Sequence, residues 1–336
     1  MLRRKNDTLK PGNTKGRSFI SIDDILKRKH FAVEEAEKSL EDLRHELMTQ
    51  ACPAESRAKV WKLLLRITKI STTNYTQLIS KGPSILDEKI RNDSFRTMTT
   101  DTSYLENVTE DELIRVLNAF SISSFTYVQG LNVLAAPFLL VLPEVEAFYS
   151  FSTFILKWCP LYAQPTMKGV HCGLRLLDMC LRSLDPALYG YLRGKDLSVS
   201  SFAFPSIMTF SACTPPLSEL LYLWDYMFAY GIHLNILFVI AQLALIRTEL
   251  LQSPSPIKVL RTLPPLRAKE IINLTHSLCK NLSADLYDKL VRHSYDESVA
   301  EELGVKSTSV STRKLDDAED VPAYMLDVED KFISPL

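Results

Sequence analysis

Hydrophobic residues recur at intervals of three and four positions along most of this 336-residue chain. That spacing places them on one face of an α-helix. The clearest segments are 36–47, 113–120, 174–184, 217–228 and 271–282. The sequence lacks the apolar/polar alternation that is typical of strands, and it lacks a short-period repeat. The pattern therefore predicts an all-α fold with no significant β-sheet.

Several helix ends follow from capping and breaking residues. Thr109 and Glu112 have the spacing of a capping box, in which each side chain accepts a hydrogen bond from the other residue's backbone, and they directly precede the segment 113–120. The pair Asp185-Pro186 ends the segment 174–184, because the residue before a proline is disfavoured in a helix.

Two long runs without Asp, Glu, Lys or Arg, 116–143 and 226–246, exceed the length needed to cross a bilayer. Both contain polar residues that hydrocarbon would penalise, including Gln129 and Asn132 in the first and His233 in the second. Buried helices of a large core explain the runs better. We therefore expect a soluble protein without a transmembrane segment.

The two ends differ in composition from the middle. Residues 1–18 carry six Lys or Arg and one Asp, and residues 305–336 carry seven acidic and four basic residues, both without helical periodicity. Such segments bury too little apolar surface to order themselves, so we predict a flexible basic tail and a flexible acidic tail. The start of the chain also lacks the apolar stretch of a secretory signal. The compact body is predicted at 19–302.

Charge and cysteine content indicate which partners, metal sites and disulfides to expect. A formal net charge of −1 gives no reason to expect a nucleic acid. The six cysteines form no CxxC pair and the histidines are scattered, so neither a metal site nor a disulfide framework is indicated. Four cysteines lie among apolar residues, which favours buried thiols in a reducing compartment.

Three short segments carry candidate chemistry. In the first, Arg57 and Trp61 begin an amphipathic helix, and a structural role for the indole is the simpler interpretation. In the second, Asp93 and Arg96 are three residues apart, so on a helix they share a face and the carboxylate can hold the guanidinium in one rotamer. A solvated surface ion pair explains the same spacing when it is taken alone.

The third segment runs from Tyr127 to Asn132 and lies in an uncharged stretch beyond the capped helix. Gln129 must there find hydrogen-bond partners or face outward at a site. Gly130 permits an unusual turn or a close backbone approach. A buried polar network that braces two helices is the structural alternative to a functional role.

Taken together, these segments resemble the TBC domain of Rab-type GTPase-activating proteins (GAPs). The chain carries RxxxW at 57–61, IxxDxxR at 90–96 and YxQGxN at 127–132, in that order, followed by Trp224-Asp225. The resemblance implies that 19–302 is a TBC helical domain. Its finger motifs then lie in 57–132, and a helical C-terminal part occupies 145–302.

In that family an arginine and a glutamine are presented to the GTPase as two fingers. By position, the resemblance implies that Arg96 is the arginine finger and Gln129 the glutamine finger. It further implies that Asp93 orients Arg96 and that Tyr127 supports the loop of Gln129. The remaining motif residues are Gly130 and Asn132 beside the glutamine and, as structural residues, Arg57, Trp61, Trp224 and Asp225.

The chemistry of phosphoryl transfer agrees with these roles. Hydrolysis of GTP needs a positioned water and neutralisation of the charge that develops on the phosphate oxygens. Arginine suits the second task because it stays protonated, and glutamine suits the first because its amide both accepts and donates. The sequence lacks GxxxxGK[ST], so GTP and Mg²⁺ are expected to belong to the partner GTPase, with no cofactor or metal in this chain. The protein would then activate an enzyme rather than act on a substrate of its own.

A narrower resemblance, to the fungal GAPs of mitotic exit and septation, is carried by the segments 89–97, 113–121, 204–225 and 228–243. That resemblance implies a cytoplasmic protein concentrated at the spindle pole body. It implies a Ras-like or Rab-like GTPase and a second GAP subunit as partners, and an inhibitory role in mitotic exit and cytokinesis. Two alternatives stay open at this point, a non-catalytic GTPase-binding scaffold with the same fold and a helical scaffold unrelated to GTPases.

Overall fold

The computed structural model describes residues 20–29 and 32–305, and over these ranges the chain forms helices and connections without a strand. The predicted all-α fold is therefore confirmed. The predicted tails, 1–18 and 305–336, lie outside the described residues, apart from Val305.

The first part of the chain contains nine α-helices. They are α1 (Ile22–Leu26), α2 (Val33–Thr49), α3 (Ala54–Leu64), α4 (Thr72–Ser80), α5 (Asp87–Ser94), α6 (Thr102–Asn107), α7 (Glu110–Ser124), α8 (Leu131–Val141) and α9 (Glu144–Thr153). A π-helical turn, η1 (Phe154–Trp158), continues α9, and a short 3₁₀ helix, η2 (Pro160–Tyr162), follows it.

The second part contains ten α-helices. They are α10 (Lys168–Leu184), α11 (Pro186–Gly194), α12 (Ser200–Met208), α13 (Leu217–Tyr230), α14 (Leu234–Leu245), α15 (Arg247–Gln252), α16 (Pro256–Arg261), α17 (Ala268–Lys280), α18 (Ala284–Arg292) and α19 (Ser298–Glu302).

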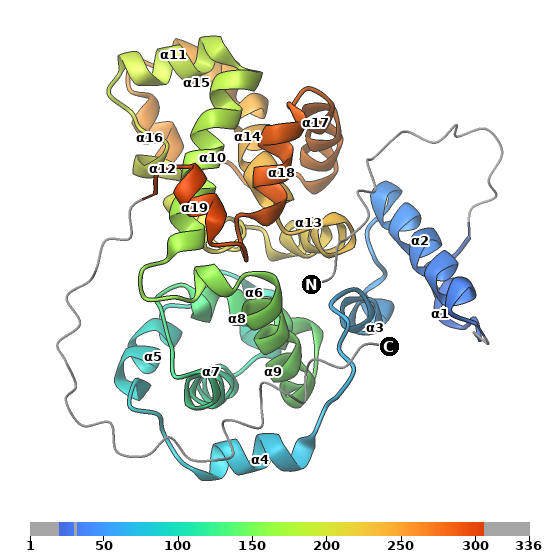
Figure 1. Ribbon diagram of the computed structural model, residues 1–336. Helices are drawn as coiled ribbons and strands as arrows, with labels where there is room; N and C mark the ends of the chain where they lie inside the picture. The colour runs from blue at the N-terminus through green and yellow to red at the C-terminus, as the bar shows by residue number, and fades with distance from the viewer. Residues whose placement is uncertain (1–19, 30–31, 306–336) are drawn as a thin grey trace.

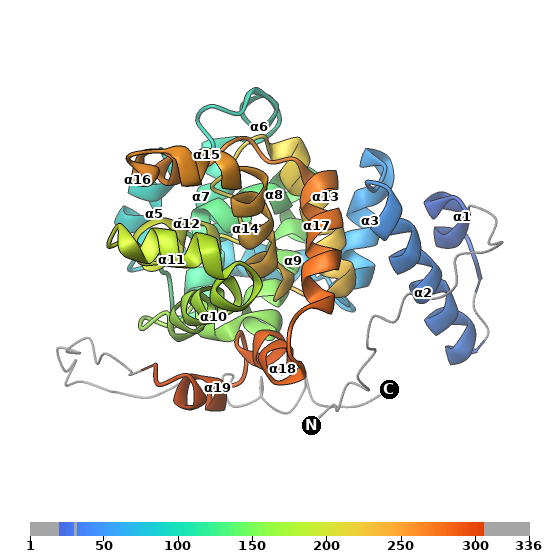
Figure 2. The same ribbon diagram turned by 90° about the horizontal axis from the view of Figure 1, so that it is seen from above.

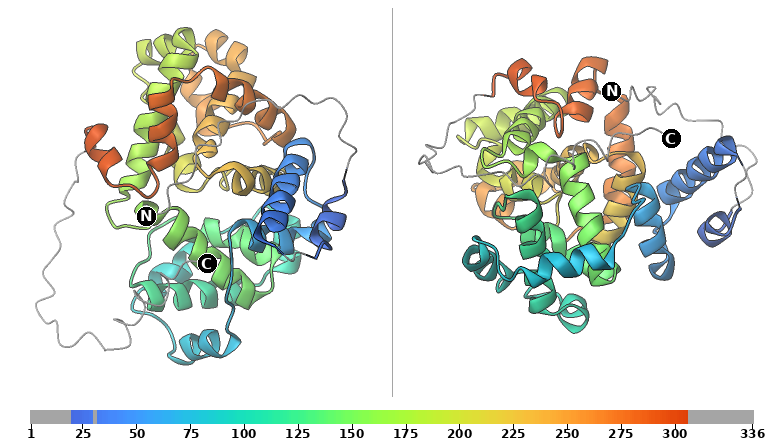
Figure 3. Two further views of the ribbon diagram at one scale, coloured as in Figure 1. Left: turned by 45° about the vertical axis from the view of Figure 1, so that its right-hand side comes forward. Right: turned by 60° about the horizontal axis from the view of Figure 1, so that its bottom comes forward.

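The helices form two groups with α13 between them. In Figure 1, α3–α9 make up the lower group and α10–α12 with α14–α19 the upper group, and the left panel of Figure 3 keeps the same division. Viewed from above, α1 and α2 lie at one side, next to α3 (Figure 2). There α2 packs against α13, and α1 packs against α2 and α3.

Local sequence signals account for individual helix ends. Thr109 and Glu112 form the predicted capping box at the start of α7, with the Thr109 hydroxyl accepting the Glu112 N–H at 3.3 Å. Helix α10 ends just before Asp185, and the Asp185 side chain caps α11 by accepting the Leu188 N–H at 3.0 Å. One apolar stripe starts later than predicted. Ala36 is exposed, whereas Leu40 is partly buried and Leu43 and Leu47 are fully buried.

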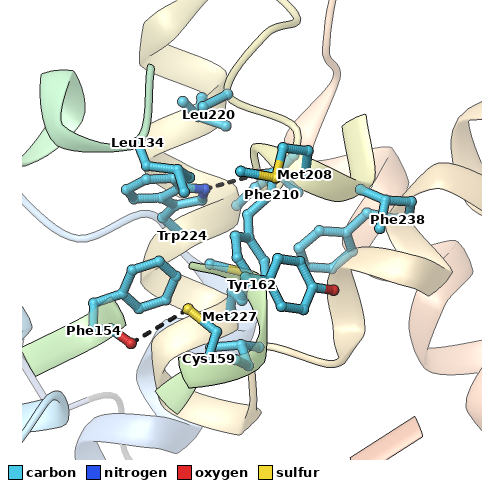
Figure 4. Packing of buried hydrophobic residues seen from close by; sticks show 14 of the residues in the cluster. Leu134, Phe154, Cys159, Tyr162, Met208, Phe210, Leu220, Trp224, Met227 and Phe238 are labelled. Carbon is cyan, nitrogen blue, oxygen red and sulfur yellow. Dashed lines mark hydrogen bonds between the residues drawn. The ribbon is translucent and has the colours of Figure 1, made fainter. Parts of the chain in front are cut away.

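Aromatic side chains fill the boundary between the two groups. Trp61 of α3 lies 5.5 Å from Phe138 of α8 and 5.8 Å from Trp224 of α13, measured between ring centroids. Figure 4 shows Trp224 donating its indole N–H to the carbonyl oxygen of Phe210, at 3.0 Å. Burying one such ring contributes about 1.5–3 kcal/mol, so this cluster holds the lower and upper groups together.

Most of the two long uncharged runs forms buried helices, as predicted, but the loop 125–130 within the first run leaves Phe125 and Gln129 exposed. The first covers most of α7 and all of α8, and the second covers the end of α13 and α14. Over the described ranges, none of the helices has both the length and the apolar character that a bilayer crossing requires. All six cysteines carry free thiols, of which four are buried and Cys213 is exposed.

Candidate functional site

The end of α5 positions the predicted Asp93–Arg96 pair. Asp93 lies in the last turn and is buried, and the chain then tightens so that the Thr97 N–H donates to the Ser94 carbonyl oxygen at 3.0 Å. Arg96 therefore lies two residues beyond the helix, not on it as its spacing suggested. The tight turn still brings the Arg96 guanidinium to the Asp93 carboxylate, with Nη2 at 2.5 Å from Oδ1.

The Asp93 carboxylate uses both oxygens. Its Oδ1 accepts from Arg96, and its Oδ2 accepts the phenol O–H of Tyr127 at 3.0 Å. Burial raises the pKa of the Tyr127 hydroxyl well above its usual range, and the neighbouring Asp93 raises it further. The phenol thus stays protonated and donates to the carboxylate at any physiological pH. The donor from Tyr127 fixes the carboxylate, and the carboxylate in turn fixes the guanidinium.

The loop between α7 and α8 carries Gln129. It begins at Phe125, which has a left-handed backbone with φ of 55°, and Thr126 then donates its hydroxyl to the Ala163 carbonyl oxygen at 2.9 Å. Gly130 starts α8 with φ of 105°, and a Cβ at this position would lie 3.1 Å from Cγ of Met208. Both the backbone conformation and the neighbouring side chain therefore favour glycine here.

Asn132 holds the other side of this loop. Its Oδ1 accepts the Gly130 N–H at 3.1 Å, and its Nδ2 donates to the Asp93 carbonyl oxygen at 3.2 Å and to the Thr97 hydroxyl at 2.8 Å. The Thr97 hydroxyl itself donates to the Asp93 carbonyl oxygen. Asn132 thus braces the end of α5 against the start of α8, which is the role that the structural alternative gave to the whole segment.

Gln129 does not share that bracing role. Its side chain is exposed and makes no hydrogen bond to another described residue, although Tyr127 and Asn132 on either side of it are both anchored to Asp93. The Arg96 side chain is exposed as well. The exposed guanidinium of Arg96 and the exposed carboxamide of Gln129 therefore extend from one hydrogen-bonded network. We call this network, formed by Asp93, Tyr127 and Asn132, the frame.

Thr97 also belongs to this frame, although the sequence analysis gave it no role. It is buried, and its hydroxyl links Asp93 to Asn132. A signal was present, since a hydroxyl residue directly after the motif arginine lies four positions from Asp93 and can reach back to its carbonyl.

Three of the four structural motif residues, Arg57, Trp61 and Asp225, form a second network inside the fold. Arg57 donates to Asp225 through Nε at 3.0 Å and Nη2 at 3.1 Å, and the Trp61 indole N–H donates to the same carboxylate at 2.7 Å. The Cys52 backbone N–H adds a donor at 3.1 Å. Burial raises the pKa of Asp225 to about 6, although Arg57 and the other donors lower it. Trp224 packs beside this network in the aromatic cluster.

Comparison with known proteins places the chain in a family. Residues 54–251 match the Rab-GTPase-TBC domain. Cell division control protein 16 of Schizosaccharomyces pombe is 45% identical over 245 residues, which cover 72% of this chain and 82% of that protein. Mitotic check point protein BUB2 of Saccharomyces cerevisiae is 35% identical over 304 residues, which cover 83% of this chain and 98% of that protein.

A solved structure agrees in fold. The Ypt/Rab-GAP domain of Gyp1p superposes with a TM-score of 0.64 at 18% sequence identity, covering 76% of this chain and 94% of that domain. The helical architecture, together with the motif frame and these matches, defines a protein of the Rab-GAP class. The chain belongs to the Rab-GTPase-TBC domain family, and membership of this family implies a small GTPase as partner.

Proposed function

We propose that this protein stimulates GTP hydrolysis by a small GTPase through two fingers, Arg96 and Gln129. The observation that carries the proposal is the frame around Asp93, which holds the arginine and the loop of the glutamine together while leaving both side chains exposed. The Arg57 guanidinium differs, because its side chain is only 11% exposed and its donors are used within the fold.

Each finger has a separate chemical task. The Arg96 guanidinium keeps its charge and donates to phosphate oxygens as negative charge develops on them. The Gln129 carboxamide accepts a hydrogen bond from the attacking water and donates to a neighbouring oxygen without changing charge. The nucleotide and its Mg²⁺ are held by the GTPase, so this chain completes an active site on its partner.

The biological setting is proposed from the relatives. Their names place them in cell-division control and at the mitotic checkpoint. We infer the same setting here, with restraint of mitotic exit and septation as the outcome, a second GAP subunit that binds the GTPase, and a location at the spindle pole body. The narrower resemblance noted for the sequence supports these finer assignments, and the first experiment below tests the second subunit.

The first experiment identifies the partners. The full-length chain is used to capture proteins from mitotic extract, with GDP and aluminium fluoride added so that the GTPase is held in a transition-state-like form. Recovery of a small GTPase together with one further protein supports the two-subunit proposal. Recovery of the GTPase alone contradicts the need for a second subunit.

The second experiment separates catalysis from binding. Single-turnover GTP hydrolysis by the captured GTPase is measured with the wild-type chain and with Gln129→Ala, each with and without the second subunit. Accelerated hydrolysis that Gln129→Ala slows at unchanged melting temperature supports the finger role. Tight binding without acceleration by the wild-type chain would instead identify a GTPase-binding scaffold.

A further inference from the structure

Large apolar side chains are unusually exposed around the fingers. Among the described residues, only three such side chains are more than two-thirds exposed, namely Ile85 at 99%, Phe95 at 76% and Phe125 at 70%. All three lie on α5, on α7 or on the connections next to these two helices, which pack against each other. The rest of the described surface leaves its large apolar side chains at most 55% exposed. The exposure is therefore concentrated on the part of the molecule that carries the site.

The two phenylalanines lie at the same end of this helix pair as the fingers. Phe95 directly precedes Arg96 at the end of α5. Phe125 ends α7 two residues before Tyr127, whose hydroxyl is bonded to Asp93 in the last turn of α5. Ile85 precedes α5 at its opposite end, and the phenylalanine pair is the part of the apolar surface that adjoins Arg96 and Gln129.

Phe125 is disfavoured in the isolated chain on two counts. Its ring is exposed to water, and its backbone is left-handed, with φ of 55° and ψ of 24°. Glycine or asparagine usually occupies this position at the end of a helix, because a larger side chain clashes with the backbone there. The Phe125 backbone N–H donates to the Ser121 carbonyl oxygen at 2.9 Å, but the ring itself remains 70% exposed.

We propose that Phe95 and Phe125 form an apolar contact that recognises the GTPase beside its nucleotide site. The inference rests on the proposed function and adds the chemistry of the partner, which is a small GTPase with an apolar surface next to its phosphate-binding region. Phe95 precedes Arg96 directly and Phe125 lies on the loop that carries Gln129, and aromatic anchors carry much of the affinity at protein interfaces.

The test uses variants of the full-length chain. Phe95→Ser and Phe125→Asn remove the rings, and the asparagine suits the left-handed backbone at position 125. Leu63→Ser is the matched control, because Leu63 is 48% exposed on α3. Helix α3 and helix α5 lie on opposite sides of the molecule in Figures 1 and 2. The probes are purified Rab-type and Ras-type GTPases loaded with a non-hydrolysable GTP analogue.

Binding affinity, melting temperature and the maximal single-turnover rate are measured for each variant. We expect Phe95→Ser and Phe125→Asn each to weaken binding by about 10- to 100-fold, the factor that loss of one buried aromatic side chain implies. The maximal rate at saturating GTPase should change little. Phe125→Asn should also melt at the same or a higher temperature than the wild type, which a structural role for the ring would not produce.

Two results would overturn the inference. One is equal binding affinity in the wild type, the Leu63→Ser control and a variant that carries both Phe95→Ser and Phe125→Asn. The other is a lower maximal rate with unchanged affinity, which would assign the rings to finger positioning. Failure of the proposed function would give a different result from failure of this inference. The wild-type chain would then bind the GTPase without accelerating hydrolysis, and the affinities of the variants would still decide the role of the rings.

Discussion

Two networks in this molecule are built from the same three parts. In each, a buried aspartate accepts hydrogen bonds from an arginine and from an aromatic side chain, as Asp93 does from Arg96 and Tyr127. Asp225 does the same from Arg57 and Trp61. The difference lies in the arginine, whose side chain is 59% exposed at Arg96 and 11% exposed at Arg57. The two sets of residues have the same kinds of side chain, so the exposure of the guanidinium distinguishes the candidate functional site from the structural network.

Sequence separation explains the difference. Arg96 is three residues from Asp93, so one turn of chain at a helix end brings them together and leaves the arginine at the rim. Arg57 is 168 residues from Asp225, and their contact ties α3 to α13 across the middle of the molecule. The first pair leaves a donor surface available to a partner, whereas the second uses its donors inside the fold. Substitutions around Asp93 should therefore change the rate of hydrolysis, and substitutions around Asp225 should change the free energy of unfolding.

Arg96→Ala should produce the largest effect, and mainly on catalysis. Loss of an arginine finger lowers the rate by about 10³–10⁵-fold, which corresponds to about 4–7 kcal/mol of transition-state stabilisation. The free energy of unfolding should fall by only about 1 kcal/mol, because the Arg96 side chain is 59% exposed and Tyr127 still donates to the Asp93 carboxylate when Arg96 is removed. Single-turnover hydrolysis and urea unfolding measure the two quantities.

Arg91→Ala is the control for this substitution, because Arg91 is similarly exposed on α5 and pairs with Asp87 instead of Asp93. It should leave hydrolysis unchanged. Arg96→Lys should remain stable but inactive, since it keeps the charge and loses the fixed donor fork. Full activity in Arg96→Ala, or its unfolding, would contradict the separation of the two networks.

Arg57→Ala should act in the opposite way, on stability. It leaves the buried Asp225 carboxylate without its charged partner, which costs about 3–5 kcal/mol. Hydrolysis at saturating amounts of folded protein should be unchanged. Urea unfolding at neutral pH measures the loss, and a stable variant with lost activity would show that this network belongs to the site.

The pH dependence of this variant gives a further signature. Burial already raises the pKa of Asp225 to about 6 with Arg57 present, above the usual 3.8, and removal of Arg57 raises it more. A carboxyl with a raised pKa in the folded state favours folding at low pH, and this contribution is lost as the pH rises through the folded-state pKa. The stability difference between wild type and Arg57→Ala should therefore shrink as the pH is lowered from 7 towards 5.

The sequence supplied the helices and the motif residues, but not their exposure. Periodicity and the capping box predicted α7, because these signals are local. The pairing of Arg57 with Asp225 had no local signal, since it depends on how α3 and α13 pack. Likewise, a phenylalanine at position 125 is normally a core residue by composition, and only the fold shows that it faces water in a left-handed turn.

Gln129 and Asn132 show the same limit within one motif. Both are amide side chains in an uncharged segment, and the sequence left open whether they brace the core or face a partner. The positive φ of Gly130 turns the chain between them, so Asn132 points into the frame and Gln129 lies outside it. One residue thus fits the structural interpretation and the other the functional one.

Asp93→Asn should have an intermediate effect, expressed mainly in the rate. The amide has one acceptor oxygen, so when that oxygen accepts from Arg96 the NH₂ faces the Tyr127 hydroxyl, which must then accept instead of donate, and the hydrogen bond from Arg96 goes to a neutral group. Loss of a charged hydrogen bond is worth about 1.5–3 kcal/mol, which predicts hydrolysis about 10- to 100-fold slower because Arg96 is no longer held. Asp87→Asn on the same helix is the control and should hydrolyse normally. A rate equal to the wild type in Asp93→Asn would show that Arg96 needs no orienting carboxylate.

The smallest predicted effect comes from Tyr127→Phe and tests whether the frame acts through this hydroxyl. The substitution removes the donor to Asp93 Oδ2 while keeping the ring buried, so it should cost about 0.5–1.5 kcal/mol of stability. It should also slow hydrolysis severalfold, since the carboxylate loses one of its two anchors. Tyr104→Phe is the matched control, because the Tyr104 hydroxyl is buried without a hydrogen-bond partner among the described residues. Its removal should be neutral or stabilising. If both phenylalanine variants unfold in the same urea concentration and hydrolyse at the same rate, the Tyr127 hydroxyl does not position Arg96, and the guanidinium is held by Asp93 and the backbone turn alone.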